Sequence, residues 1–373
     1  MIIKKNPEDF YVKEVIDFPN SSGNYSYYLL WKKNLTTIRA IKIIKKKLRI
    51  SRYRISYAGK KDKRAVTEQY ISIKDFEGKE KYDFGNVKLY YIGNFSEPVS
   101  IKLLKGNIFR ILVRDINKLE KEEFYKVLKI AKRAFPNYFD EQRFGGIRCI
   151  NHLVGICLLK RDYENACKII LTYVSDRENE RARRSREFLN KNWGKFSEAL
   201  KIFPKYLDIE TPILNHLVKK PKDFKGALKT LHKKLLKMFI HSVQSYIFNL
   251  TLSKIIETEF SKTKYISFSF GKLYFPYEIP KKNIKIPIVG YDTNLDKFYF
   301  KDIILELLEK LNIELEDFYF EDFPLLRSKG SERDAFVKPK DFKFEEKDEN
   351  MELSFFLPKG SYATILVKYL FIR

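Results

Sequence analysis

A single carboxylate, that of Asp62, lies among basic side chains in the segment YAGKKDKRAVTEQY. Its basic neighbours are Lys60, Lys61, Lys63 and Arg64. Nearby positive charge favours the ionised form of a carboxylate, and an ionised carboxylate can act as a nucleophile or as a general base. The segment therefore predicts either a catalytic loop or a solvated charged turn.

The segments on either side of Asp62 have the pattern of β-strands. RISYA, which precedes it, is apolar and β-prone, and AVTEQYISI, which follows, alternates with the period of two typical of a half-buried strand. We therefore expect Asp62 in a loop at the end of a sheet, where scaffolds often display functional groups.

A second carboxylate offers a competing interpretation. Asp62 followed by Glu77, Gly78 and Lys79 loosely matches the Asp…Glu-x-Lys set of metal-dependent nucleases, which hold a divalent ion on two carboxylates. Glu-x-Lys is common in a chain so rich in both residues, so this pattern is weak. The three cysteines lack C-x-x-C spacing and the four histidines are scattered, so we expect neither a disulfide framework nor a metal site.

The charge of the whole chain indicates a polyanionic partner. Among 373 residues, 73 lysines and arginines exceed 48 acidic residues and leave a net charge of +25. Such an excess favours nucleic acid or an acidic membrane surface, and 24 tyrosines and 31 phenylalanines offer rings on which bases could stack. High growth temperature also enriches lysine and glutamate, but it does not explain an excess of one sign.

The N-terminal segment MIIKKNPEDF has no apolar core and does not resemble a signal peptide. The longest uncharged stretch, residues 238–253, contains polar side chains and looks like a buried helix rather than a membrane span. We expect a cytoplasmic protein with reduced thiols and no membrane partner. No obligate protein partner is evident.

The order of the expected elements indicates a sheet-based domain interrupted by a long insertion. Residues 1–115 read mainly as strands with one helix, over 36–48, whose apolar stripe includes Ile41 and Ile44. A second helix over 118–134 precedes the loop PNYFDEQRFGG. The remaining expected segments are mostly helical over 151–260, strands and turns over 265–300, an acidic helix over 302–316, and strand then helix in the last forty residues.

Two basic segments lie within the helical part. DRENERARRSREFL places Arg177, Arg181 and Arg184 on one helical face, and LVKKPKDFKGALKTLHKKLLKMF carries eight lysines. A run of one sign can be a solvated helix surface. Because these runs are so dense, we expect them to meet phosphates.

Four ordered motifs resemble the TruD family of tRNA pseudouridine synthases. AGKKDKRAVTEQ resembles the family signature G-x-K-D-[KR]-x-A-x-T-x-Q, in which Asp62 occupies the aspartate position. IKKNPEDFYVKE, PNYFDEQRFG and LPKGSYATILVKYL resemble three further motifs, and HSVQSYIFN resembles a helix of the family's insertion. One departure is Asp140, where the family usually has glycine.

The resemblance implies an enzyme that isomerises a uridine of tRNA to pseudouridine without cofactor or metal, with uridine 13 as the known target. It implies that Asp62 is the catalytic carboxylate and Lys4 its basic partner, and a mobile terminal lysine is the alternative for Lys4. It also implies that Asn137 helps to hold the catalytic loop and that Phe139 is the aromatic platform for a flipped base. Plain core packing is the alternative for Phe139.

The resemblance further implies an α+β fold. Its catalytic domain has a mixed, largely antiparallel sheet with flanking helices, interrupted by an inserted α/β domain. We expect the catalytic domain over 1–150 and 330–373 and the inserted domain over 151–329. As phosphate contacts we choose, from residue type and position, Lys61, Lys63, Arg64 and Arg143. Two other classes stay open: a metal-dependent nuclease, and a tRNA-binding protein without catalysis.

Overall fold

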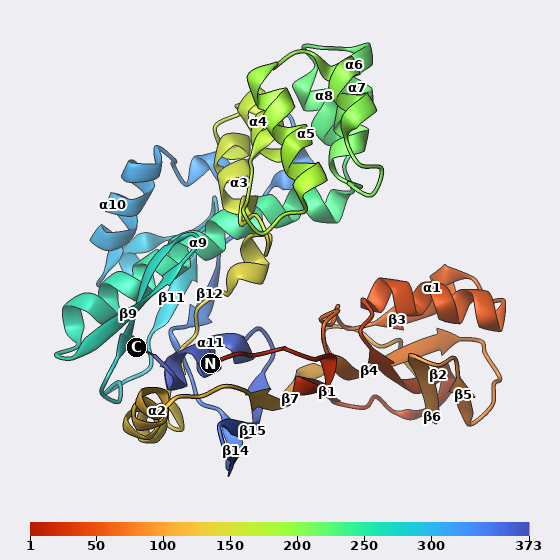
Figure 1. Ribbon diagram of the computed structural model, residues 1–373, viewed down its shortest axis with the longest axis vertical. Coiled ribbons are helices and arrows are strands. Elements are labelled where there is room, and N and C mark those ends of the chain that lie inside the picture. Colours follow the sequence, from red (N-terminus) through yellow and green to blue (C-terminus); the bar gives the residue numbers. More distant parts are fainter. Residues whose placement is uncertain (373) are drawn as a thin grey trace. The chain divides into compact units, whose positions relative to one another are not determined.

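The computed structural model describes residues 1–372, which divide into two compact units, coloured by sequence in Figure 1. Unit 1 comprises residues 1–135 and 337–372, and unit 2 comprises Pro136–Phe336. The domains expected from sequence divide the chain at 150/151 and 329/330. In the structure, the intervening segments 136–150 and 330–336 pack with unit 2.

Unit 1 is built on one nine-stranded sheet in the order β14-β15-β7-β1-β4-β2-β6-β5, with β3 paired to β4. The strands are β1 (Phe10–Ile16), β2 (Ser21–Lys33), β3 (Ile55–Tyr57), β4 (Val66–Lys74), β5 (Lys81–Asp83), β6 (Val87–Phe95), β7 (Leu104–Val113), β14 (Lys340–Lys347) and β15 (Asn350–Pro358). Within the described chain, β1 and β4 form the one parallel pair of this sheet. The predicted mixed, largely antiparallel sheet is confirmed.

Helices flank this sheet, as predicted. They are α1 (Thr37–Leu48), α2 (Lys118–Ala131) and α11 (Ala363–Leu370), with short 3₁₀ turns η1 (Pro7–Asp9) and η2 (Arg52–Arg54). Ile41 and Ile44, on the predicted apolar face of α1, are buried in one core with Leu30, Ile71 and Leu89 of the sheet. Thr36 begins α1 because its side chain accepts a hydrogen bond from the backbone N–H of Arg39.

Unit 2 is mostly helical, as the sequence predicts for 151–260. Its helices are α3 (Asn151–Leu159), α4 (Tyr163–Thr172), α5 (Glu180–Lys191), α6 (Phe196–Ile202), α7 (Glu210–Lys219), α8 (Phe224–Lys229), α9 (Lys233–Glu259) and α10 (Lys301–Leu311). Its 3₁₀ turns are η3 (Glu141–Phe144), η4 (Leu295–Lys297), η5 (Glu316–Phe318) and η6 (Pro324–Leu326). Strands β9 (Thr263–Phe268) and β10 (Gly271–Pro276) form a hairpin, and β11 (Lys285–Ile288) pairs with β12 (Ser331–Asp334). The short strands β8 (Phe135–Pro136) and β13 (Phe336–Val337) also pair.

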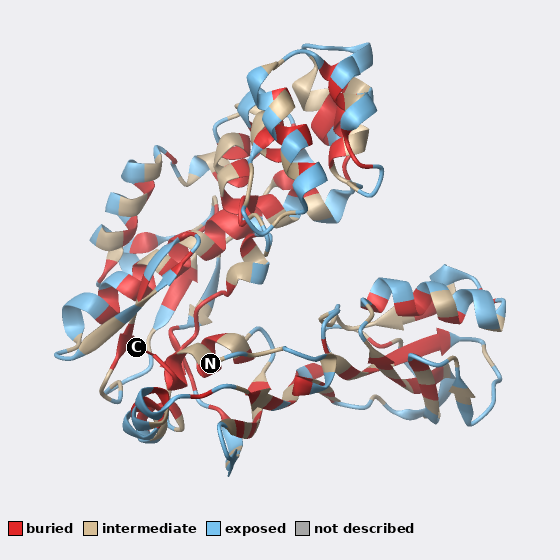
Figure 2. Ribbon diagram, viewed as in Figure 1, coloured by how far each residue is buried: buried red, intermediate tan, exposed pale blue. Residues whose placement is uncertain are grey.

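The long helix α9 contains the uncharged stretch that the sequence marks as a buried helix. Figure 2 shows α9 buried along much of its length. Its buried residues include the polar side chains of Ser242, Gln244 and Asn249. Of the helices described over residues 1–372, none is long and apolar enough to cross a membrane.

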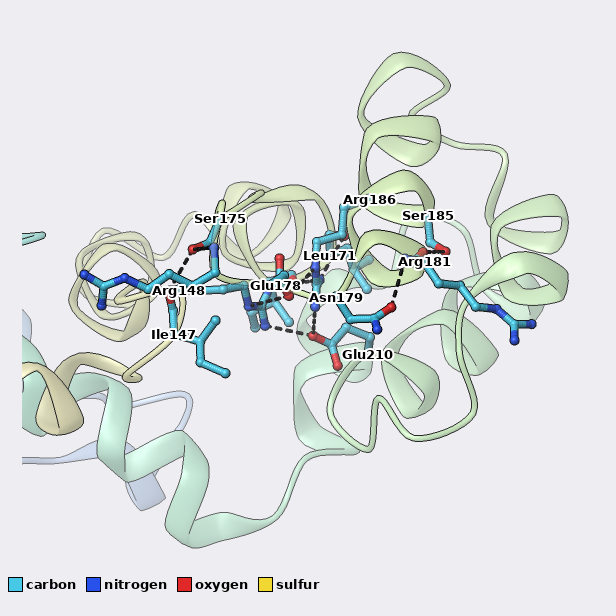
Figure 3. A network of polar contacts seen from close by, with 12 residues as sticks. Ile147, Arg148, Leu171, Ser175, Glu178, Asn179, Arg181, Ser185, Arg186 and Glu210 are labelled. Atoms are coloured by element: carbon cyan, nitrogen blue, oxygen red, sulfur yellow. Dashed lines mark hydrogen bonds and ion pairs between the residues drawn. The ribbon is translucent and has the colours of Figure 1, made fainter. Parts of the chain in front are cut away.

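A buried ionic network links α5 and α7 to the segment before α3 (Figure 3). Arg186 is 1% exposed, and its guanidinium lies 2.7 Å from Glu210 Oε1 and 3.1 Å from Glu178 Oε1. Arg148 donates to the same Glu210 oxygen at 2.8 Å and to the carbonyl of Ile170 at 2.7 Å. Burial, and then the nearby Arg186, lower the pKa of Arg148, so the two carboxylates must offset an unfavourable arrangement of like charges.

Candidate active site

The parallel pairing of β1 and β4 positions the predicted carboxylate. Because Tyr11 pairs with Val66, the two strands begin at the same edge of the sheet, and the segments that precede them meet there. Lys4 precedes β1 and Asp62 precedes β4. The Nζ atom of Lys4 lies 2.5 Å from Oδ2 of Asp62 and 3.9 Å from the ring centre of Phe10. The Asp62 side chain is 29% exposed and can be reached from solvent.

A buried lysine, Lys32, holds the backbone at Asp62 by a hydrogen bond. Lys32, at the end of β2, is fully buried, and its ammonium donates to the carbonyls of Asp62 at 2.8 Å and Leu35 at 2.7 Å. Burial lowers the pKa of Lys32 to about 8, against the opposing attraction of Asp62. Burying the ammonium of Lys32 costs desolvation free energy, so a specific role for this side chain is indicated. Its hydrogen bond to the Asp62 carbonyl indicates that this role is to hold the loop.

A hydrogen-bonded chain fixes the start of the same loop. The backbone N–H of Lys61 donates to the Thr37 hydroxyl at 2.9 Å, and that hydroxyl donates to Gln69 Oε1 at 2.7 Å. The amide of Gln69 in turn donates to the carbonyl of Gly59 at 3.1 Å. Both Thr37 and Gln69 are fully buried, so this chain ties the loop to α1 and β4.

The predicted phosphate contacts near Asp62 differ in their surroundings. Lys61 forms an ion pair with Glu14, with 2.5 Å between Nζ and Oε1, and its side chain is only 9% exposed. It therefore already has a buried partner, and we assign it to holding the loop rather than a phosphate. Lys63 and Arg64 are exposed, and Arg64 donates to the carbonyl of Lys5 at 2.7 Å.

Unit 2 contains a second group of predicted residues. The side-chain carbonyl of Asn137 accepts a hydrogen bond from Arg333 at 2.6 Å, and its amide donates to the carbonyl of Asp334 at 2.9 Å. The guanidinium of Arg333 also lies over the ring of Phe139, 4.2 Å from its centre. Phe139 is 6% exposed and packs edge-to-face on Phe248. In this structure its ring is buried.

Buried polar side chains of α9 hold the loop that carries these residues. The Asn249 amide group bonds both backbone groups of Phe139, accepting from N–H at 2.9 Å and donating to C=O at 2.8 Å. Ser242 donates to the carbonyl of Arg143 at 2.8 Å. The Arg143 guanidinium lies 5.0 Å from the Phe139 ring centre and is half-buried. Asp140, the departure from the family pattern, has a φ of −88°, which any residue adopts, so glycine is not required there.

The arrangement of β4 separates the two carboxylates of the nuclease pattern. Asp62 precedes β4 at Val66, and Glu77 follows its end at Lys74. A nine-residue strand of this kind spans about 26 Å, whereas two carboxylates that share a divalent ion both lie within about 2.6 Å of it. Across residues 1–372, no group of three or more His, Cys, Asp or Glu side chains is arranged to hold a metal ion.

Comparison with known proteins identifies the family. The family model described as "tRNA pseudouridine synthase D (TruD)" matches residues 1–267 and 277–370. This chain belongs to the TruD family.

Individual TruD proteins match over nearly their full length. A "Probable tRNA pseudouridine synthase D" of Nanoarchaeum equitans is 39% identical over 100% of this chain and 99% of its own. A "tRNA pseudouridine synthase D" of Aquifex aeolicus is 31% identical over 99% of this chain and 97% of its own. The crystal structure of a putative TruD protein of Methanosarcina mazei superposes with a TM-score of 0.74 at 31% identity, covering 99% of this chain and 93% of that one.

Within this TruD chain, the predicted site residues fall into two groups. Unit 1 carries Asp62 with Lys4, Lys61, Lys63 and Arg64, and unit 2 carries Asn137, Phe139 and Arg143. Three further residues contact these groups and were not predicted: Lys32, Glu14 and Arg333. For two of the three, the alternation pattern of the sequence contained a signal. Lys32 and Glu14 occupy the apolar face of their strands, in step with Leu30 and Val12.

Proposed function

We propose that this protein converts a uridine of tRNA, uridine 13, into pseudouridine, with Asp62 as the catalytic carboxylate, and that it does so in the cytoplasm. Membership of the TruD family over nearly the whole chain supports the reaction class. The observation that carries the residue assignment is the contact between Asp62 and Lys4. The Asp62 carboxylate is accessible and is paired with the Lys4 cation, and its loop is fixed by buried hydrogen bonds.

The reaction is an isomerisation and is balanced without a co-reactant. The N1–C1′ glycosidic bond breaks, the base turns, a C5–C1′ bond forms, C5 loses a proton and N1 gains one. Asp62 would begin this sequence either by attacking the ribose or by taking a ribose proton, and both routes need an ionised oxygen. In the structure, Oδ2 of Asp62 is paired with the ammonium of Lys4.

The other residues of the site would bind and orient the RNA. A uridine must leave its stack to be isomerised, and by family resemblance Phe139 would receive the flipped base. Since Arg333 and Arg143 both lie at the buried Phe139 ring, a base can stack there only when at least one of these guanidinium groups moves. Lys63, Arg64 and Arg143 would contact phosphates. Unit 1 would be the catalytic domain and unit 2 the inserted domain.

We expect the purified protein to form pseudouridine in an unmodified tRNA transcript, and to do so equally well with and without EDTA. The chemistry assigned to Asp62 uses only side chains and substrate. Single-turnover incubation followed by carbodiimide mapping of pseudouridine would locate the modified position. A transcript with uridine 13 replaced by cytidine is the matched control and should remain unmodified.

Three results would overturn parts of this proposal. Pseudouridine at another position would exclude uridine 13 as the target. Strand cleavage that EDTA abolishes would support a metal-dependent nuclease. Stable tRNA binding with neither product would support a binding protein without catalysis.

Lys32→Met should lower the rate of pseudouridine formation about ten- to a hundredfold while leaving tRNA affinity within about twofold. Methionine fills the same buried space but cannot donate to the Asp62 carbonyl, and a displacement of about 1 Å at a reacting group costs about a hundredfold in rate. The buried side chain cannot itself reach RNA. Single-turnover rates at saturating tRNA, together with filter binding, separate the two effects.

The matched control is Lys33→Met. Lys33 is the next residue of β2, is partly exposed and pairs with Glu8. Its substitution should change the rate less than about threefold. Equal rates for Lys32→Met and Lys33→Met would show that Lys32 does not position the loop.

A further inference from the structure

Helix α1 carries a row of cations that no other part of the described chain neutralises. Its solvent side presents what we call the α1 stripe, defined as Arg39, Lys42, Lys45, Lys46 and Arg49. All five residues are exposed. Apart from the consecutive residues Lys45 and Lys46, each member lies three or four residues from the next, so these neighbours lie side by side on the helix surface.

The α1 stripe is unfavourable for an isolated helix. Lys42 and Lys46 are a like-charge pair at i,i+4, and such a pair destabilises a helix by about 0.2–0.5 kcal/mol. Arg39 lies in the first turn, where the helix dipole opposes a positive charge. The dipole favours the cations of the last turn, but it gives no reason for Arg39 or Lys42.

Two other charged helices of this protein, α5 and α10, are arranged differently. On α5, Arg184 pairs with Glu180 and Arg183 with Glu187, and on α10, Lys310 pairs with Glu306. Such pairs are the usual arrangement of a lysine- and glutamate-rich surface adapted to high temperature. The first turn of α1 has no acidic residue, and among residues 1–372 none forms an ion pair with the α1 stripe. A partner of opposite charge is therefore missing from the chain itself.

The position of α1 indicates what that partner is. Its first residue, Thr37, bonds the Lys61 N–H beside Asp62, so the helix starts at the catalytic loop. Twelve residues at 1.5 Å each extend it about 18 Å from there. The turn that follows α1 presents Tyr53, which is 98% exposed and has no packing role that the structure shows. An aromatic ring next to a row of cations is the combination that binds phosphates and unpaired bases.

We propose that the α1 stripe binds backbone phosphates of the tRNA substrate along about 18 Å of surface that leads away from the reacting uridine, and that Tyr53 stacks on an unpaired base at its far end. This inference rests on the proposed function for the identity of the RNA. The straight row suits a duplex arm of tRNA, since proteins recognise double-stranded RNA largely through its shape and its phosphates. The surface adds an anchor outside the catalytic loop, so it contributes to affinity rather than to chemistry.

The test removes three charges from the α1 stripe by Lys42→Gln, Lys45→Gln and Lys46→Gln. Glutamine has nearly the helix propensity of lysine, so the fold should be kept. We expect filter binding of an unmodified tRNA transcript to weaken about ten- to a hundredfold at low salt. The slope of log affinity against log salt should become shallower by about 2–3, because each lost phosphate contact removes about 0.7–0.9. The melting temperature should hold or rise as like-charge repulsion is relieved.

The matched control removes three exposed lysines elsewhere in unit 1, by Lys102→Gln, Lys118→Gln and Lys129→Gln. Both triple variants lower the net charge equally, from +25 to +22. An equal loss of affinity in the two variants, or no loss in either, would overturn the α1 assignment. A fall in melting temperature without loss of affinity would instead assign the cations to helix stability.

Tyr53→Ala tests the aromatic part separately. We expect about tenfold weaker binding, within the range measured for loss of one stacking contact, and Tyr53→Phe should restore it. Wild-type affinity for Tyr53→Ala would remove Tyr53 from the proposal. All of these readouts are affinities, so they remain decisive if the wild-type protein binds tRNA but forms no pseudouridine, the result that defeats the proposed function alone.

Discussion

Replacing Asp62 by asparagine should abolish pseudouridine formation, with a fall in single-turnover rate of at least a thousandfold. Asparagine has nearly the same shape but lacks the ionised oxygen that either route requires, and loss of a nucleophile or base that acts within a unit has effects of this size. The hydrogen bond from Lys32 to the Asp62 carbonyl and the one from the Lys61 N–H to Thr37 do not depend on the carboxylate and should keep the loop in place. Affinity for tRNA should hold or rise slightly, because one negative charge is removed from a basic surface.

The measurement pairs the reaction rate at saturating tRNA with filter binding and a thermal scan. Asp115→Asn is the matched control, since Asp115 is an exposed carboxylate of the same unit that pairs with Lys5 at 3.5 Å. It should keep the wild-type rate within about twofold. An Asp62→Asn protein that retains a tenth of the wild-type rate would exclude Asp62 as the catalytic group.

Replacing Glu210 by glutamine should lower the free energy of unfolding of unit 2 by about 3–5 kcal/mol. Oε1 of Glu210 accepts from both Arg148 and Arg186, and the Glu210 side chain is 3% exposed. Its neutral replacement leaves the buried guanidinium of Arg186 and the partly buried one of Arg148 with Glu178 as their one remaining carboxylate in the network of Figure 3. Breaking a buried ion pair from one side has a cost of this size because the remaining charge stays buried.

The fluorescence of Trp193 reports this change directly. The chain has two tryptophans, and Trp31→Phe would leave only Trp193, which packs on Phe196 and Phe224 within unit 2. Urea unfolding in that background measures the difference. Glu180→Gln is the control, because its pair with Arg184 is exposed and should contribute less than about 0.5 kcal/mol. A Glu210→Gln protein as stable as this control would show that the network is not needed for folding.

Patterns of two kinds allowed the sequence to predict part of this molecule. Alternation with a period of two predicted the strands around Asp62, and the order of four family motifs singled out Asp62 as the candidate catalytic carboxylate. The contact with Lys4 was predictable only through the family resemblance, because its cause is the parallel register of β1 and β4, which joins segments 58 residues apart.

The sequence could not show which of its charged residues turn inward. Arg186 was counted within a basic run expected to meet phosphates, yet it lies on the buried stripe of α5 with Ala182 and Leu189. Lys61 was likewise expected at a phosphate and is paired with Glu14. Composition gives the number of charges, but only packing decides which of them face a partner. The exposed cations of the α1 stripe were missed for the opposite reason, because the sequence pattern of this helix drew attention only to its apolar side.

The sheet of unit 1 also sets an order of events during synthesis. Strand β15 pairs with β7, but about 200 residues of unit 2 are translated between them. At about 5–20 residues per second, the ribosome needs roughly 10–40 s to reach β15, and during that time the outer edge of β7 has no partner. Unpaired strand edges invite association with other chains. Nascent chains of this protein therefore pass through an interval in which unit 2 can complete its own core while the sheet of unit 1 lacks two of its nine strands, β14 and β15.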